Sequence, residues 1–235
     1  MTMQGKTIVV TGGFGALGSA VAEAAVRRRA SVAALDYAPA APAGFAGRLG
    51  PSGLIVGGVD LSLPHAAQRA MAEVTARFGR IDALLNIAGG FRWEKIADAA
   101  NAETWDRMFA INLKTALNAS RAALPHLLQS GAGRIVNVGA QSAIRASEGM
   151  GPYAASKSAV HRLTESLADE LKLKGVTVNA VLPSIIDTPA NRADMPNADF
   201  SRWVAPADLA AVMLFLASDE ARAVTGALIP VTGRV

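Results

Sequence analysis

Short apolar runs alternate with longer segments of helical length along almost the whole chain. Runs of this length fit strands that are buried on both faces, and the segments between them are long enough to cross back over a sheet as helices. We therefore predict an α/β fold, in which a doubly wound and mostly parallel sheet carries helices on both faces. The expected strands are residues 6–11, 31–36, 54–59, 81–87, 134–138, 176–182 and 227–232, and the expected helices are residues 16–29, 64–78, 103–129, 152–174 and 206–218.

The length and composition of the chain favour a single domain over residues 1–235. Of these residues, 51% are hydrophobic and 18% are charged, which suits one sizeable core and argues against a disordered chain. Residues 38–53 hold three prolines and four glycines, so we expect a surface loop there in place of a helix. Pro125 should bend or end the longest expected helix near Leu124. Residues 184–205 follow the expected strand at residues 176–182 and are expected to form a substrate loop, with a surface loop that packs locally as the alternative.

Composition also excludes several classes of chemistry. The chain has no cysteine, so disulfides, thiolate metal sites and thiol nucleophiles are ruled out, and we expect no metal. The formal net charge of +4 comes from 23 basic and 19 acidic residues spread along the chain, which does not favour nucleic-acid binding. No stretch has the pattern of an export signal or a membrane span. A cytoplasmic protein with a small-molecule substrate is the resulting expectation.

A glycine-rich turn over residues 11–18 joins the first expected strand directly to the first expected helix. Glycine allows positive φ in a tight turn and lets a diphosphate approach the backbone, while the free amides at the start of a helix favour negative charge. In this setting the turn predicts a dinucleotide site in a Rossmann-type sheet, and the alternative is a merely tight connection. The residues assigned to the cofactor here are Gly12, Phe14, Gly15, Leu17 and Gly18.

Asp36 stands at the end of the second expected strand. A carboxylate there accepts hydrogen bonds from both hydroxyls of an adenosine ribose and repels a 2′-phosphate, so it favours NAD, with NADH preferred over NADPH. Tyr37 and Phe14 stand where an NADP site would carry Arg or Lys. The alternative is that Asp36 only caps a loop.

Two later strand ends carry polar residues with two possible roles. Asp60 either accepts from an adenine amino group or serves as an ordinary turn residue. Asn86 either contacts the cofactor or ties adjacent strands together, and Gly89 and Gly90 allow close backbone approach. The cofactor residues expected from these segments are Asp60, Leu61, Asn86, Ala88 and Gly89.

Tyr153 and Lys157 are four residues apart on an expected helix, so their side chains share one face. A tyrosine hydroxyl exchanges protons poorly at neutral pH unless a nearby cation stabilises the phenolate, and a lysine ammonium does so. The pair therefore predicts an acid/base site in which Lys157 lowers the pKa of Tyr153. On spacing alone, a surface helix motif is the alternative.

The order of these features along the chain adds a second line of argument. A glycine turn, Asp36, NIAG, Asn112, YAASK and LPSIIDTP follow one another, and from Lys6 to the C-terminus the chain resembles the short-chain dehydrogenase/reductase family. The resemblance implies a homo-oligomer, a dimer or a tetramer, paired through the helices around residues 103–129 and 152–174. It also implies a catalytic role for Tyr153, ribose binding by Lys157, a proton-relay water held by Asn112, and a cover over the nicotinamide amide from Pro183, Ile186 and Thr188.

The chain departs from the family pattern at two places. Ala16 replaces the middle glycine of the turn, and Ala140 replaces the serine that polarises the substrate, thirteen residues before the tyrosine. Ser142 would project to the same side as Ala140 in an extended segment, so it is a candidate substitute, with a plain loop serine as the alternative. With GGFGALGS and DTPANRADMPNADFSRW, Ala140 also gives a local resemblance to quinonoid dihydropteridine reductases.

These features predict an NAD(H)-dependent short-chain oxidoreductase that transfers hydride between nicotinamide and a small carbonyl or alcohol substrate. One alternative is a quinonoid dihydropteridine-type reductase, in which a conjugated imine needs no polarised carbonyl. Another is a dinucleotide-binding sensor without catalysis, motivated by Ala140. The sequence leaves open the substrate, the physiological direction, the role of Ser142 and the choice between dimer and tetramer.

Overall fold

A computed structural model describes residues 2–99 and 102–235. Within these residues the strands form one seven-stranded sheet in the order β3-β2-β1-β4-β5-β6-β7, and every neighbouring pair is parallel. The predicted doubly wound sheet is confirmed, and the strand ends differ from those expected by a few residues at most. The strands are β1 (Thr7–Thr11), β2 (Ser31–Leu35), β3 (Gly53–Val56), β4 (Ala83–Asn86), β5 (Arg134–Val138), β6 (Thr177–Pro183) and β7 (Leu228–Val231).

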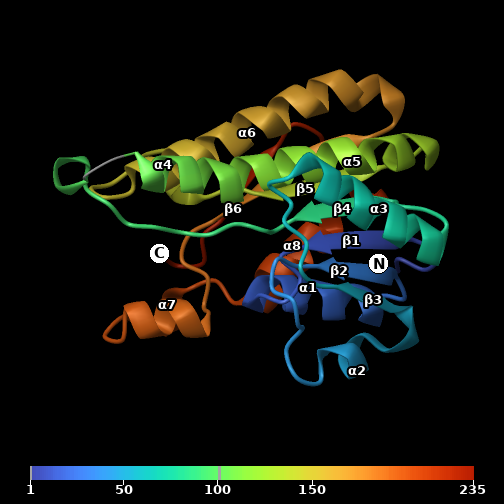
Figure 1. Cartoon of the computed structure of the whole chain (residues 1–235), viewed down its shortest axis with the longest axis horizontal. Helices are drawn as coiled ribbons and strands as arrows, with labels where there is room; N and C mark the ends of the chain where they lie inside the picture. The colour runs from blue at the N-terminus through green and yellow to red at the C-terminus, as the bar shows by residue number, and fades with distance from the viewer. Residues whose placement is uncertain (1, 100–101) are drawn as a thin grey trace.

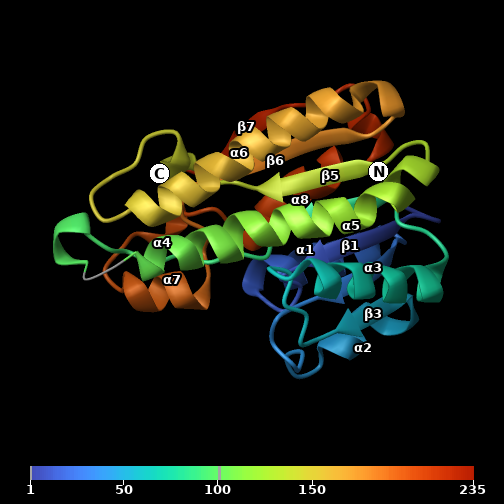
Figure 2. The ribbon, with the colours of Figure 1, turned by 45° about the horizontal axis from the view of Figure 1, so that its top comes forward.

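Helices cover both faces of the sheet, as Figure 1 shows. On one face α1 packs against α8, and on the other α3 packs against α5, with α6 beside them. Short helices lie outside these layers, and Figure 2 shows two of them, α4 and α7, at the end of the molecule away from the N-terminus. The helices are α1 (Ala16–Arg27), α2 (Phe45–Leu49), α3 (Pro64–Phe78), α4 (Glu103–Met108), α5 (Thr115–Gln129), α6 (Gly151–Leu171), α7 (Pro189–Asp194) and α8 (Pro206–Leu216).

The alternation of side chains along β1 explains why both faces are apolar. Ile8 and Val10 pack in one buried cluster with Val21 of α1 and Met213 of α8. Val9 points to the other face and joins a second buried cluster under α3, α5 and α6. A strand that is buried on both faces needs apolar residues at successive positions, which is the continuous run seen in the sequence.

The segment over residues 38–53 is not the helix-free loop that we expected. Phe45 begins the short helix α2, and Phe45 and Leu49 are fully buried against the α1 side of the core. These two residues are one turn apart and therefore share a face. Burial of two large apolar side chains stabilises one turn of helix, despite the prolines and glycines around it.

The helix expected over residues 103–129 is interrupted at a different place from the one predicted. It does not end at Pro125, because α5 continues to Gln129. The irregularity is a π-helical turn over Phe109–Lys114, which separates α4 from α5 and holds Asn112. Such turns often mark functional sites, because they re-aim a side chain without ending the helix.

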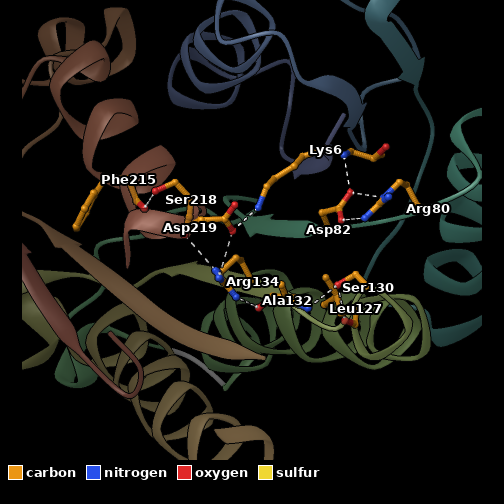
Figure 3. Close-up of polar contacts among 12 residues, drawn as sticks. Lys6, Arg80, Asp82, Leu127, Ser130, Ala132, Arg134, Phe215, Ser218 and Asp219 are labelled. Carbon is orange, nitrogen blue, oxygen red and sulfur yellow. Dashed lines mark hydrogen bonds and ion pairs between the residues drawn. The ribbon is translucent and has the colours of Figure 1, made fainter. Parts of the chain in front are cut away.

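A polar network links segments at the amino edge of the sheet, as Figure 3 shows. Asp219 accepts from Lys6 at 2.5 Å and pairs with the buried Arg134 at 3.5 Å, while Arg134 Nε donates to the Ser218 carbonyl at 3.2 Å. Nearby, Asp82 accepts from the Thr7 backbone amide at 2.9 Å. These contacts join the starts of β1, β4 and β5 to one another and to the segment after α8.

The direction of the chain crossings reverses beside β1, because β2 and β3 lie on one side of it and β4 to β7 on the other. Thr11 at the end of β1 pairs with Asn86 at the end of β4. In open parallel sheets, ligands bind in the crevice beyond the carboxyl ends of strands at this kind of switch point.

Among the described residues, no helix combines the length and apolar character needed to cross a bilayer.

Candidate active site

The glycine turn brings the end of β1 against the segment that follows β4. Gly12 has φ of +65°, and a Cβ built there would lie 2.9 Å from the backbone of Ala88. A Cβ on Gly18 would lie 2.0 Å from the Gly12 carbonyl oxygen. Side chains at Gly12 and Gly18 are therefore excluded, and the turn is as tight as the sequence predicts.

The start of α1 has features that suit an anion. Gly15 precedes the helix without a side-chain cap, and the first turn carries no acidic residue. The amides of Ala16, Leu17 and Gly18 have no intrahelical acceptor, because the first such bond runs from the Ser19 amide to the Gly15 carbonyl at 2.9 Å, and free amides at a helix start suit a diphosphate. A Cβ on Gly15 would make only ordinary contact, 3.5 Å from the Gly12 oxygen. The residues present thus fit a dinucleotide, with Ala16 in place of the usual glycine.

Asp36 is fixed directly beside this turn. One carboxylate oxygen accepts from the Phe14 amide at 2.9 Å, and the other accepts from the Ala38 amide at 2.9 Å. The loop-capping alternative is therefore part of its role, yet each oxygen keeps a further lone pair for a ribose hydroxyl. The Phe14 ring meets Phe45 edge-on, with ring centroids 5.9 Å apart, so Phe14 contributes its backbone to the turn.

Asp60 and Asn86 take up the structural roles that were left open. Asp60 accepts from both the amide and the hydroxyl of Ser62, at 2.9 and 2.6 Å, as a turn residue does. Asn86 Nδ2 donates to Ser120 at 3.1 Å and to Asn137 at 2.8 Å, which ties β4 to α5 and β5. Asn86 Oδ1 is buried without a hydrogen-bond partner. Contacts of Asp60, Leu61 and Asn86 with a cofactor stay predictions.

Tyr153 and Lys157 lie on one face of α6 near its start, as their spacing predicts. The Lys157 side chain is buried, and Nζ donates to the Val138 carbonyl oxygen at 2.8 Å. A Cβ on Gly89 would lie 3.4 Å from Lys157 Nζ and 2.5 Å from Asn112 Oδ1. The segment after β4, the π-helical turn and α6 therefore converge at the carboxyl edge.

The pKa values of this pair move in opposite directions. Burial raises the pKa of Tyr153 to about 12 and lowers the pKa of Lys157 to about 8. Each pKa shifts because a low-dielectric setting disfavours the charged form of the group, which is the phenolate of Tyr153 and the ammonium of Lys157. Burial is the cause of both shifts, and the lowering of the Tyr153 pKa by Lys157 stays a prediction. At neutral pH the phenol is protonated.

Asn112 links α6 to the segment after β4. Its side chain accepts from the Gly90 amide at 2.9 Å and donates to the Gly90 carbonyl at 3.1 Å and to Ser156 Oγ at 3.0 Å. Ser156 in turn donates to the Tyr153 carbonyl at 2.7 Å. The side chain of Asn112 is thus a structural link, and its support of a relay water stays a prediction.

The geometric argument for Ser142 is wrong. Residues Gln141–Ala143 form a single 3-10 turn after β5 and not an extended segment, with the Ala143 amide donating to the Ala140 carbonyl at 3.1 Å. Side chains two residues apart in a 3-10 turn point in different directions. Ser142 is half-buried, and its role as a substitute donor stays a prediction without that support.

Residues 184–205 form a loop that is closed at its base and packed on itself. Ile186 bridges to Val204, and Thr188 caps α7 by accepting from the Asn191 amide at 3.2 Å. Arg192 pairs with Asp187 through contacts of 2.6 and 2.7 Å and lies over an aromatic ring of the same loop. Contacts of Pro183, Ile186 and Thr188 with a nicotinamide stay predictions.

Three site residues were missed by the sequence argument. Phe91 packs edge-on against the Tyr153 ring with centroids 5.0 Å apart, and Ser156 links Asn112 to α6. His161 is buried beside Ala140. The helical spacing of His161 from Lys157 was a usable signal, whereas the positions of Phe91 and Ser156 depend on contacts between distant segments.

Comparison with known proteins agrees with this geometry. A profile of the short chain dehydrogenase family matches residues 6–199. The 2-(S)-hydroxypropyl-CoM dehydrogenase 3 of Xanthobacter autotrophicus is 32% identical, over 98% of the chain and 96% of that protein. The meso-2,3-butanediol dehydrogenase of Serratia marcescens is 34% identical, over 99% of the chain and 95% of that protein.

A solved structure adds the same result at the level of the fold. The 3-ketoacyl-(acyl-carrier-protein) reductase of Brucella melitensis, crystallised with NADH, superimposes with a TM-score of 0.91 at 27% identity and covers 99% of each chain. Sequence and structure therefore match over nearly the full length of the chain. The protein belongs to the short-chain dehydrogenase/reductase family.

Proposed function

We propose that the protein is an NAD(H)-dependent oxidoreductase that transfers hydride between nicotinamide and a small carbonyl or alcohol substrate, with Tyr153 as the acid/base. The observation that carries the proposal is the convergence of Tyr153, Lys157, Gly89 and Asn112 at the sheet edge that also holds the glycine turn. Buried titratable groups cluster at functional sites, which makes a buried lysine on the same helix face as a tyrosine a candidate for chemistry as well as for support.

The cofactor would be held by residues whose geometry suits each of its parts. The first-turn amides of α1 suit the diphosphate, the Asp36 carboxylate suits the adenosine ribose, and Lys157 suits the nicotinamide ribose. When bound, the dinucleotide supplies or accepts the hydride. The chain's part is to orient the two reactants and to exchange a proton.

Tyr153 is protonated at neutral pH, as a tyrosine with the ordinary pKa of 10.0 is, and burial raises its pKa further, to about 12. In the reductive direction the phenol donates its proton to the substrate oxygen, and in the oxidative direction a phenolate must form first. The Lys157 ammonium favours that phenolate, since an adjacent cation stabilises negative charge. Phe91 lies against one side of the Tyr153 ring and limits the approach of solvent from that side.

The test is a Tyr153→Phe variant, which removes one hydroxyl and keeps the ring that packs on Phe91. We expect turnover to be lost while NADH still binds, as measured by absorbance at saturating NADH and by fluorescence titration. Tyr37→Phe is the matched control, because Tyr37 is the other tyrosine and is 73% exposed. Unchanged turnover in Tyr153→Phe would show that the acid/base assignment is wrong.

Cofactor preference has its own test at Asp36. We expect wild-type protein to bind NADH more tightly than NADPH, because the fixed carboxylate repels a 2′-phosphate. Asp36→Ser should reduce the difference in affinity between the two cofactors, because NADH binding becomes weaker and NADPH binding becomes stronger. Fluorescence titrations with both cofactors measure this, and tighter NADPH binding by the wild type would contradict the proposal.

A second candidate function follows from Ala140, which is buried and cannot donate a side-chain hydrogen bond. A quinonoid dihydropteridine-type substrate is a conjugated imine, so its reduction does not require a polarised carbonyl. NADH oxidation should therefore be measured with ketones, quinones and a quinonoid dihydropterin. Turnover of the pterin alone favours the second candidate, and turnover of any acceptor eliminates a non-catalytic sensor.

We also propose a homo-oligomer, a dimer or a tetramer, assembled through the faces of α5 and α6, and a cytoplasmic location. Both helices carry alanines that permit close packing between subunits. Sedimentation velocity of the purified protein measures the assembly, and a monomer at micromolar concentration would contradict it.

A further inference from the structure

His161 is a buried titratable residue on the catalytic helix that the proposed reaction does not use. It follows Lys157 by one turn and Tyr153 by two turns, so the three side chains share one face of α6. Only 4% of His161 is exposed. A buried imidazole needs hydrogen-bond partners, and its surroundings show where they come from.

The imidazole contacts the segment that follows β5. The Ala140 amide donates to Nε2 at 3.4 Å. A Cβ on Gly139 would lie 2.4 Å from Nε2 and 2.6 Å from a methyl carbon of Leu182, so the ring occupies space that only glycine leaves free. Because Nε2 accepts, the neutral ring carries its proton on Nδ1.

The charge environment keeps the ring in its accepting form. Burial lowers the pKa of His161 to about 4, and the positive charges of Arg162 and Lys157 act in the same direction. The strands packed against the ring present Gly139, Ala140 and Leu182, which do not titrate. A neutral acceptor is therefore available throughout the physiological range.

Two backbone groups at the end of β5, the Val138 carbonyl and the Ala140 amide, have no hydrogen-bond partner within the sheet. The Gly139 amide donates to Val181 of β6 at 2.9 Å, so the polar groups of Val138 and Ala140 point the other way. The pairing of β5 with β4 ends at Asn137, so that neighbour does not reach them. Lys157 and His161 supply the missing partners, one for the Val138 carbonyl and one for the Ala140 amide.

We propose that His161 is a positioning residue, which acts through the Ala140 amide and the Gly139 backbone to hold the end of β5 against Lys157. The inference rests on the proposed function. On this inference α6 holds the end of β5 through two hydrogen bonds, from Lys157 to the Val138 carbonyl and from the Ala140 amide to His161. The segment held in this way leads to Ala140 and Ser142, where the family's polarising serine is missing. Loss of the hydrogen bond to His161 shifts Val138 and therefore Lys157, the residue that would hold the nicotinamide ribose.

The test compares three variants with the wild-type protein. His161→Leu removes the acceptor, and His161→Gln restores one that reaches the same amide. Thr164→Val is the matched control, because Thr164 accepts from Asn137 of β5 at 2.9 Å one turn further along α6. The readouts are the NADH dissociation constant, kcat and KM with an acceptor found in the screen above, and ring-nitrogen NMR of the wild type.

We expect His161→Leu to weaken NADH binding and to lower kcat by about 2- to 10-fold each, the factor expected for one lost hydrogen bond. His161→Gln should recover most of both losses. Thr164→Val should lower only the melting temperature. The NMR spectrum should show Nε2 unprotonated and Nδ1 protonated at pH 7.

Three results would overturn the inference: a protonated Nε2, a His161→Leu protein with unaltered NADH affinity and kcat, or a Gln variant no better than the Leu variant. Equal losses in Thr164→Val would also overturn it, because the effect would then be general. If the Leu variant does not fold, the Gln variant and the NMR spectrum decide. Failure of the proposed function looks different, since the wild type then neither binds NADH nor turns over while the NMR still reports the tautomer.

Discussion

Lys157 should make the stability of the protein depend on pH in an unusual direction. Burial lowers the pKa of its ammonium from the ordinary 10.5 to about 8. Below pH 8 both the native and the unfolded chain carry the proton, and the native state bears the cost of a buried charge. Between pH 8 and 10.5 the unfolded chain keeps a proton that the native state has released, so the free energy of unfolding rises with pH.

The magnitude follows from the two pKa values. The difference between 10.5 and about 8 corresponds to about 3 kcal/mol over the full interval. A Lys157→Met variant lacks this contribution. It also leaves the Val138 carbonyl without its partner, at a cost of about 1–3 kcal/mol that does not depend on pH. The difference in stability between the two proteins should therefore shift by about 3 kcal/mol in favour of the wild type from pH 7 to pH 10.5.

The assay is urea unfolding followed by tryptophan fluorescence, at one protein concentration and at pH 7, 8, 9, 10 and 10.5. Lys172→Met is the control, because it removes a positive charge from a side chain that is 52% exposed. Its difference from the wild type should stay nearly constant. If the difference for Lys157→Met also stays constant within about 0.5 kcal/mol, burial does not penalise the ammonium and the reasoning fails.

Three further outcomes are expected. Gly18→Ala should destabilise the protein and abolish NADH binding, since its Cβ would lie 2.0 Å from the Gly12 oxygen, while Gly15→Ala should leave the melting temperature within a few degrees. Phe45→Ala should cost about 3–5 kcal/mol in urea unfolding, because the ring is fully buried, and a cost below 1 kcal/mol would refute the role given to α2. Because the pKa of His161 is lowered to about 4, the unfolded chain binds a proton before the native state does as the pH falls from 6.5 to 4. The free energy of unfolding of the wild type should therefore fall by up to about 3 kcal/mol over this range, and His161→Leu should lack this loss.

The parts of the fold that the sequence predicts are those written in local patterns. Buried parallel strands require continuous apolar runs, and crossover helices require their own spacing, so the order of elements follows from the chain alone. The tight turn at Gly12 and the shared face of Tyr153 and Lys157 are equally local, because each depends on residues within two turns of helix or one strand end.

Other features depend on neighbours that are distant in the chain. The helix at Phe45 forms because the apolar side chains of Phe45 and Leu49 are buried in the core, against the local signal of proline and glycine. The irregular turn at Asn112 follows from its bonds to Gly90 and Ser156. Ser142 lies in a tight turn after β5, where alternation no longer applies.

Sequence by itself therefore determined the layers, the glycine turn and the shared helix face of Tyr153 and Lys157, since spacing decides which groups share a face. Tertiary structure alone decided their electrostatics and their supports. Burial, which depends on everything packed around a group, moved the pKa of Tyr153 up and that of Lys157 down. Tertiary structure also placed His161 against the Ala140 amide, and no local pattern encodes a contact between these two segments.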